Sequence, residues 1–217
     1  MRWLALAALA AAPAAAQDAA PPCELHVWPA DAAKSFTTVT DIDWGISEVQ
    51  KYSRDPLNPL TGTRASVALQ AAVFERLDLP VLLHLPGHAV VLHDTPLPSR
   101  VIRATRGRIL PDSAPCYAEL ITDDVFFQED LHADFDLLNK GVLNTTFRFR
   151  RFDGGDSPVF SYGSFVTSDL YEPGKRVSFT PASAIARFEI VFAESVTEFA
   201  EKMHAAGQAR DRGKKRK

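Results

Sequence analysis

Residues 145–150 read Thr-Thr-Phe-Arg-Phe-Arg, and this stretch decides the fold because its side chains alternate with a period of two. Successive side chains of a β-strand point to opposite faces, so the phenylalanines share one face and the arginines the other. Asp153-Gly154-Gly155-Asp156 follows as a turn, and residues 159–166 return as a second apolar segment. The sequence therefore predicts a β-hairpin across residues 142–166.

Other segments have the patterns that strands show. Residues 24–28 alternate and stop at Pro29, and residues 117–122 begin a strand that can continue to Phe127. Two short apolar runs, 81–85 and 89–92, flank the turn dipeptide Pro86-Gly87 and predict a second hairpin. Residues 31–53 are ambiguous and carry a weak helical pattern.

Two segments have the spacing of amphipathic helices. Thr63 is a suitable N-cap for a helix that ends before Pro80. Thr180-Pro181 starts a second helix, whose apolar stripe runs from Ile185 to Met203 and which we expect to end near Gly207. Its polar face is acidic, so we expect the apolar face to pack on the sheet rather than on a membrane.

Strands outnumber helices and are partly sequential, which favours the α+β class. We predict a single domain with a largely antiparallel sheet and a long amphipathic C-terminal helix packed on it. The order of elements resembles that of small α+β domains of bacterial envelope accessory proteins, a likeness of fold that says little about function. The expected organisation is a signal peptide at 1–16, a linker at 17–22, the domain at 23–207 and a basic disordered tail at 208–217.

The N-terminus has the layout of a secretory signal peptide. Arg2 supplies a positive charge, residues 4–12 form a short apolar run, and Ala14-Ala15-Ala16 is a small-residue cleavage site. The run is too short to span a bilayer, which takes about 20 apolar residues. We therefore expect cleavage near Ala16 and release into the periplasm or the medium. The alternative, a lipid attached to Cys23, is disfavoured because Ala20-Pro21-Pro22 precede that cysteine.

The chain contains two cysteines, Cys23 and Cys116. An even number of cysteines in an exported protein predicts a disulfide. A bridge that closes a loop of roughly 90 residues stabilises a fold by about 4–5 kcal/mol in the chain-entropy model. The alternative, Cys116 as a nucleophile with a histidine partner, has no local sequence signature.

The formal net charge of −3 hides an asymmetry, because residues 210–217 contain six Lys or Arg and one Asp. The rest of the chain is therefore acidic, which argues against nucleic acid or an anionic membrane as its main partner. The basic tail can contact an anionic surface, although a solvated terminus is the favoured interpretation. An unidentified protein or small molecule is the expected partner.

Three histidines, His84, His88 and His93, are close in sequence but do not predict a metal site. The predicted 81–92 hairpin places His84 and His88 on opposite faces, whereas zinc ligands must converge to about 2 Å from one ion. The acidic residues between 123 and 136 lack the spacing of a calcium loop and are expected to be solvated.

Arginines supply the strongest ligand-site signal. A guanidinium group suits planar, bidentate recognition of phosphate or carboxylate. The candidate anion-binding residues are Arg100, Arg103, Arg106 and Arg108, joined by Arg148, Arg150 and Arg151 if the two segments are adjacent. The competing interpretation is that these arginines are exposed and offset an acidic surface.

Motifs of common catalytic sites are missing from the sequence. It contains no G-x-S-x-G, no H-E-x-x-H, no S-x-x-K, no P-loop and no dinucleotide-binding glycine fingerprint, so we expect no cofactor. We expect a non-catalytic exported domain that binds a partner or acts as an envelope accessory protein. The alternatives are an anion-binding module that uses the four arginines and a hydrolase that uses His93, Asp94 or the acids at 123–136.

Overall fold

A computed structural model describes residues 23–31, 33–41, 46–50, 63–132, 140–171 and 181–214. The predicted signal peptide, the linker, Asp134, Asp136 and the last three residues of the tail lie outside the described residues. The side chains of Glu129 and Asp130 are likewise not described.

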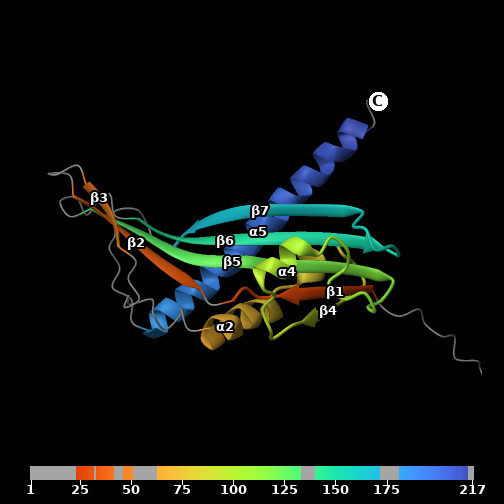
Figure 1. Cartoon of the computed structure of the whole chain (residues 1–217), viewed down its shortest axis with the longest axis horizontal. Helices are drawn as coiled ribbons and strands as arrows, with labels where there is room; N and C mark the ends of the chain where they lie inside the picture. The colour runs from red at the N-terminus through yellow and green to blue at the C-terminus, as the bar shows by residue number, and fades with distance from the viewer. Residues whose placement is uncertain are drawn as a thin grey trace, which may run out of the picture.

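A seven-stranded sheet forms the centre of the molecule (Figure 1). Its main path has the order β3-β2-β5-β1-β4, and β6 pairs with the other edge of β5 and with β7. The strands are β1 (Cys23–Trp28), β2 (Lys34–Asp41), β3 (Ile46–Gln50), β4 (His88–Leu92), β5 (Cys116–His132), β6 (Lys140–Asp153) and β7 (Phe160–Asp169).

The predicted hairpin at 142–166 is confirmed as β6 and β7. These strands pair over 10 residues, and β5 and β6 pair over 14, both antiparallel. The two longest ladders make the sheet largely antiparallel, so the α+β prediction is confirmed. Phe147 and Phe149 are buried on one face of β6, while Arg148 and Arg150 are only partly covered on the other.

The predicted hairpin at 81–92 is wrong. Residues Leu79–Leu82 form a short helix, α3, because Asp78 caps it by accepting a hydrogen bond from the Val81 N–H and Pro80 suits its first turn. β4 pairs in parallel with β1 instead, and β1 pairs in parallel with β5.

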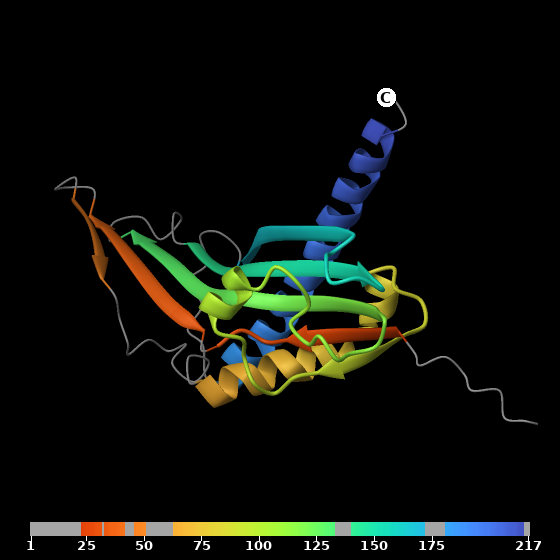
Figure 2. The same ribbon diagram turned by 45° about the vertical axis from the view of Figure 1, so that its right-hand side comes forward.

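The weak helical pattern at 31–53 is also wrong, because this region forms β2 and β3. The run Thr37-Thr38-Val39-Thr40 is β-branched, and such side chains favour strands over helices. The β2–β3 pair extends from the end of the sheet that lies farthest from β4 (Figure 2).

Two long helices, α2 (Thr63–Arg76) and α5 (Pro181–Lys214), pack on one face of the sheet. Aromatic side chains dominate this core, with Phe74 against Phe192 and Phe147 against Phe199 at ring-centroid distances of 5.4 and 5.1 Å. The short helix α4 (Ser99–Ala104) lies on the opposite face (Figure 1). The fold is thus a sheet between a layer of long helices and a thinner covering layer.

α5 continues to Lys214, beyond Gly207 where we expected it to end. Gly207 does not adopt a positive φ, and its neighbours Ala205, Ala206 and Ala209 are strong helix formers. Residues 208–214, expected to be disordered, are therefore helical, and they extend past the sheet (Figure 1). No described helix has an apolar stretch long enough to cross a bilayer.

Candidate functional site

The sheet face beneath α4 carries charged and aromatic side chains. Strand alternation places Glu24, His26 and Trp28 of β1 on this face, and the parallel register aligns them with Tyr117, Glu119 and Ile121 of β5. Residues 94–115 lie across it, and we call them the covering segment. The site is therefore built where a polar sheet face meets an irregular segment.

A buried ion pair joins β5 to β6 under the covering segment. Glu119 is fully buried and accepts hydrogen bonds from Arg150 Nε at 2.6 Å and from the Ile109 backbone N–H at 2.7 Å. Arg150 Nη1 donates to the carbonyl oxygens of Thr105 and Gly107 at 2.8 and 3.0 Å. The Glu119–Arg150 pair thus forms hydrogen bonds with three residues of the covering segment.

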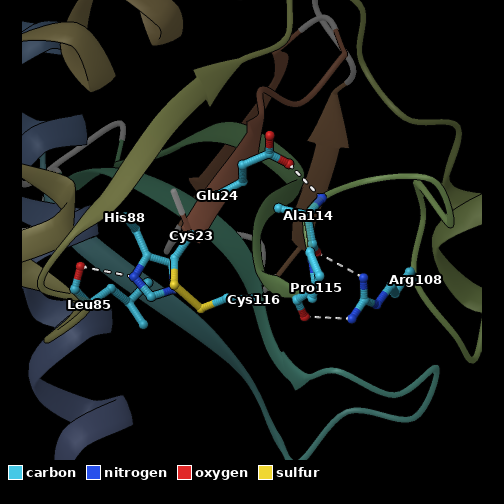
Figure 3. The surroundings of a disulfide bond; sticks show 8 residues. All are labelled: Cys23, Glu24, Leu85, His88, Arg108, Ala114, Pro115 and Cys116. Atoms are coloured by element: carbon cyan, nitrogen blue, oxygen red, sulfur yellow. Dashed lines mark hydrogen bonds between the residues drawn. A yellow bond between two sulfur atoms is a disulfide. The ribbon is translucent and has the colours of Figure 1, made fainter. Parts of the chain in front are cut away.

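Arg108 also has a structural role, contrary to its proposed role in anion binding. Its guanidinium donates to the carbonyl oxygens of Ala114 and Pro115 (Figure 3). It also donates to the carbonyl oxygen of Gly155 and lies 5.4 Å from the centre of the Tyr117 ring. These carbonyl oxygens occupy the N–H groups of Arg108 that an anion would need. The sequence pattern could not separate Arg108 from its neighbours, because its partners are backbone carbonyl groups, in the loop that follows it and in the distant β6–β7 turn.

The phenol of Tyr117 lies in this buried layer. Burial raises its pKa well above the usual value, and the negative charge of Glu119 raises it further. The phenol therefore stays protonated at any physiological pH and is not available as a base.

Four of the other candidate arginines line a hollow of about 350 Å³ between α4, β6 and β7, which we call the arginine hollow. Its lining includes the side chains of Arg103, Arg106, Arg148, Arg150 and Ser161, whereas the ring of Tyr162 points to the opposite face of β7 and packs on Phe199 of α5. The adjacency of the 100–108 segment and β6, which the sequence left open, is therefore confirmed for Arg148 and Arg150. Arg100 is exposed and is not among the lining residues, and Arg151 points to the opposite face of β6.

The four arginines of the hollow differ in how far they are neutralised. Arg148 pairs with Asp123 at 2.9 Å and Arg150 pairs with Glu119. Arg103 and Arg106 are exposed and have no carboxylate partner within the part of the chain that the structure describes. The hollow thus has two paired guanidinium groups at its sheet side and two unpaired ones on the covering segment.

A carboxylate–histidine chain lies on β1, which β5 separates from the strands that line the hollow. Glu24 Oε2 is 3.1 Å from His26 Nε2, and His26 Nδ1 is 2.9 Å from His93 Nε2. Because the carboxylate can only accept, His26 Nε2–H donates to Glu24. When His26 is neutral, its Nδ1 accepts a hydrogen bond from His93 Nε2–H. The ring of His93 stacks on Trp28 with centroids 4.2 Å apart.

The sequence missed this chain of hydrogen bonds, because the β1–β4 register that brings His93 to His26 has no local signal. Hydrogen bonds from His26 and the Ala114 N–H lower the pKa of Glu24. Burial and the charge of nearby His26 lower the pKa of His93.

We predict that this His93 shift makes the fold less stable in mild acid. The unfolded chain binds a proton at His93 near pH 6.5, the folded chain at a lower pH, so stability is lost as the pH falls below 6.5. The contribution of Glu24 is lost only below about pH 4.5. Urea unfolding should therefore show a smaller difference in the free energy of unfolding between pH 7.5 and pH 5.5 for His93→Phe than for the wild type. An equal difference in the two proteins would exclude His93 as the cause.

Among the other acids proposed for a hydrolase, the structure describes the side chains of Asp94, Asp123 and Asp124, and the charge of Asp94 acts on His93, whose pKa it raises. Asp123 pairs with Arg148, and Asp124 Oδ1 accepts a hydrogen bond from the Val125 N–H. Asp94 is exposed and accepts from the hydroxyl of Thr95 at 3.1 Å.

A second hollow, of about 380 Å³, lies between α5, β6, β7 and the α3–β4 turn. His84 and His204 stack there with ring centroids 3.6 Å apart, and Arg151 and Arg210 also line it. Phe149, Phe160 and Met203 supply apolar lining. Nothing in the sequence predicts it, since His84 and His204 come from elements far apart in the chain.

The predicted disulfide between Cys23 and Cys116 is confirmed (Figure 3). The two Cα atoms are 4.6 Å apart, and the bridge joins the first residues of β1 and β5. Because the sulfur of Cys23 is used in this bond, it is not free to carry a lipid.

Comparison with known proteins gives a distant likeness of structure. No family model matches the chain, and no curated protein matches it. One similar crystal structure is a Xanthomonas campestris protein described by the family-model DUF330, with 14% identity, 90% of this chain and 93% of that chain covered, and a TM-score of 0.40. Another is an uncharacterized protein with 11% identity, 84% and 94% coverage, and a TM-score of 0.33. We draw no functional conclusion from either.

Proposed function

We propose that this chain is an exported, non-catalytic binding domain and that the arginine hollow holds an anionic ligand. The observation that carries the proposal is the pair Arg103 and Arg106. Both line the hollow, and neither has a carboxylate partner among the described residues. Two unpaired guanidinium groups beside two paired ones leave an excess of about two positive charges for a ligand to balance.

The chemistry of the hollow favours a phosphate, sulfate or carboxylate group on a small polar molecule. Guanidinium groups bind such oxygens in a bidentate manner, and the hydroxyl of Ser161 adds a neutral hydrogen-bonding group. The volume of about 350 Å³ lies at the lower end of the range for small-molecule sites, about 300–1,000 Å³.

Export is part of the proposal. The N-terminal layout of a signal peptide supports it, and so does the disulfide, because such bonds persist in oxidising compartments outside the cytosol.

We predict that Arg103→Ala/Arg106→Ala abolishes anion binding without lowering stability. Wild-type protein should melt at a higher temperature in millimolar phosphate, sulfate or anionic oligosaccharide, because a ligand at 100 times its Kd stabilises a fold by about 2.7 kcal/mol. The double variant should show no shift, and calorimetric titration should give one site per wild-type chain.

Two control variants locate the site. Arg100→Ala removes an exposed arginine of α4 that does not line the hollow, and Arg151→Ala removes one from the second hollow. Both should keep the wild-type shift. A wild-type melting temperature that no anion changes would refute the proposal, and loss of the shift only in Arg151→Ala would move the site to the second hollow.

The hydrolase alternative now rests on one observation, the Glu24–His26–His93 chain of hydrogen bonds. A carboxylate that orients one histidine toward another can support general acid–base chemistry at the outer ring, here His93. Turnover in a panel of hydrolase substrates that is lost in His93→Gln would favour this function over simple binding.

A further inference from the structure

His88 lies against the disulfide. Its Nε2 atom is 3.7 Å from Cys116 Sγ, and the two sulfur atoms and this nitrogen all lie within 4.8 Å of one another (Figure 3). All three are the first residues of their strands, β1, β5 and β4, which are adjacent and parallel. The N-terminal ends of these three strands therefore hold three potential metal ligands close together.

The hydrogen bond at the other ring nitrogen fixes the tautomer of His88. His88 Nδ1 is 3.1 Å from the Leu85 carbonyl oxygen, which can only accept, so Nδ1 carries the proton (Figure 3). Nε2 then carries a lone pair and faces the sulfur atoms. A histidine that donates through one nitrogen to a carbonyl and presents the other is the arrangement found in protein zinc sites.

We propose that Cys23, Cys116 and His88 form a zinc site when the disulfide is reduced. A dithiol reductant would transfer two electrons and two protons to the bridge, giving two thiols and leaving the reductant as a disulfide. Zn²⁺ would then displace both thiol protons and bind two thiolates and the neutral imidazole, with water as the fourth ligand.

The distances fit this coordination. Tetrahedral zinc with Zn–S bonds of about 2.3 Å and a Zn–N bond of about 2.05 Å separates sulfur from nitrogen by about 3.6 Å. Cys116 Sγ and His88 Nε2 are already 3.7 Å apart. Reduction frees the sulfur atoms to separate to about 3.8 Å, which side-chain rotation can supply.

Access also fits, because Cys23, Cys116 and His88 are each partly exposed. A reductant and an ion can therefore reach the site without unfolding the sheet. In the oxidised protein both sulfur atoms are bonded to each other and no thiolate is present, so the site is controlled by redox state.

The test uses Co²⁺ as an optical probe for zinc in the chain from residue 17 onward. Protein reduced with a phosphine under anaerobic conditions should bind one Co²⁺ per chain, with thiolate-to-metal absorption and the bands of a tetrahedral ion, and Zn²⁺ should displace it. Oxidised wild type and Cys23→Ser/Cys116→Ser should show neither signal. Absence of the thiolate bands in reduced wild type would overturn the proposal.

Two variants test the role of His88. His88→Gln should weaken Co²⁺ binding at least tenfold, whereas His84→Gln, four residues earlier in the chain, should bind like the wild type. Equal affinity of His88→Gln and wild type would remove His88 from the site. If reduction unfolds the chain, Zn²⁺ should restore its circular dichroism and its cooperative melting transition, and failure to restore them would refute the site equally.

Discussion

Loss of the Cys23–Cys116 bridge is expected to lower the free energy of unfolding by about 2–5 kcal/mol, a large part of the 5–15 kcal/mol typical of a domain. The bridge joins residues 93 positions apart, so it removes much of the freedom of the unfolded chain. Urea unfolding of Cys23→Ser/Cys116→Ser against oxidised wild type measures the change.

The native state also depends on this bridge, because Cys23 is the first residue of β1 and the bridge fastens it to β5. Without it, the start of β1 keeps its ladders to β4 and β5 and the hydrogen bond from the Ala114 N–H to Glu24. We therefore expect a weakened but folded protein. Reduced wild type in a metal-free buffer should lose the same free energy as the double variant. A loss below about 1 kcal/mol would show that the unfolded state is already compact or that native strain offsets the entropy.

Local patterns allowed the sequence to predict the central hairpin and the two long helices. Phe147 and Phe149 alternate with Arg148 and Arg150, and such a period of two indicates a β-strand with one buried face. The disulfide was predictable for a different reason, since two cysteines in a chain with the layout of a signal peptide allow one pairing. Neither inference required knowledge of which strands are neighbours.

The site could not be predicted because it depends on strand order. His26 and His93 meet through a parallel pairing whose connection includes α2 and α3, and parallel register leaves no mark in the local sequence. The hairpin predicted over 81–92 is wrong because Pro80, which in the sequence indicates the end of a helix, lies in the first turn of α3. The sequence grouped Arg100, Arg103, Arg106 and Arg108 as one candidate anion site, but Arg103 and Arg106 line the hollow, whereas Arg108 donates to loop carbonyl oxygens.

Arg150→Met is expected to destabilise the fold by about 3–5 kcal/mol, because it leaves the charge of the fully buried Glu119 without its cation. Arg148→Met is the matched control. Arg148 lies two residues away on the same face and also pairs with an acid, but its side chain is 40% exposed against 11% for Arg150. The Asp123 side chain is 12% exposed, whereas that of Glu119 is 0% exposed, so Arg148→Met should lose clearly less stability than Arg150→Met. Similar losses in the two variants would contradict the argument from burial.

The double variant Glu119→Leu/Arg150→Met separates the charge from the hydrogen bonds. Removing both charges should recover much of the stability lost in Arg150→Met, since the desolvated carboxylate is gone. It should not restore the covering segment, because the Thr105 and Gly107 carbonyls and the Ile109 N–H lose their partners. Hydrogen exchange at Ile109 and trypsin cleavage after Arg103 and Arg106 should therefore stay faster than in the wild type, even where urea unfolding shows a nearly normal fold. Wild-type protection in the double variant would mean that the apolar contacts of Ile102 and Ile109 with the sheet suffice to hold the segment.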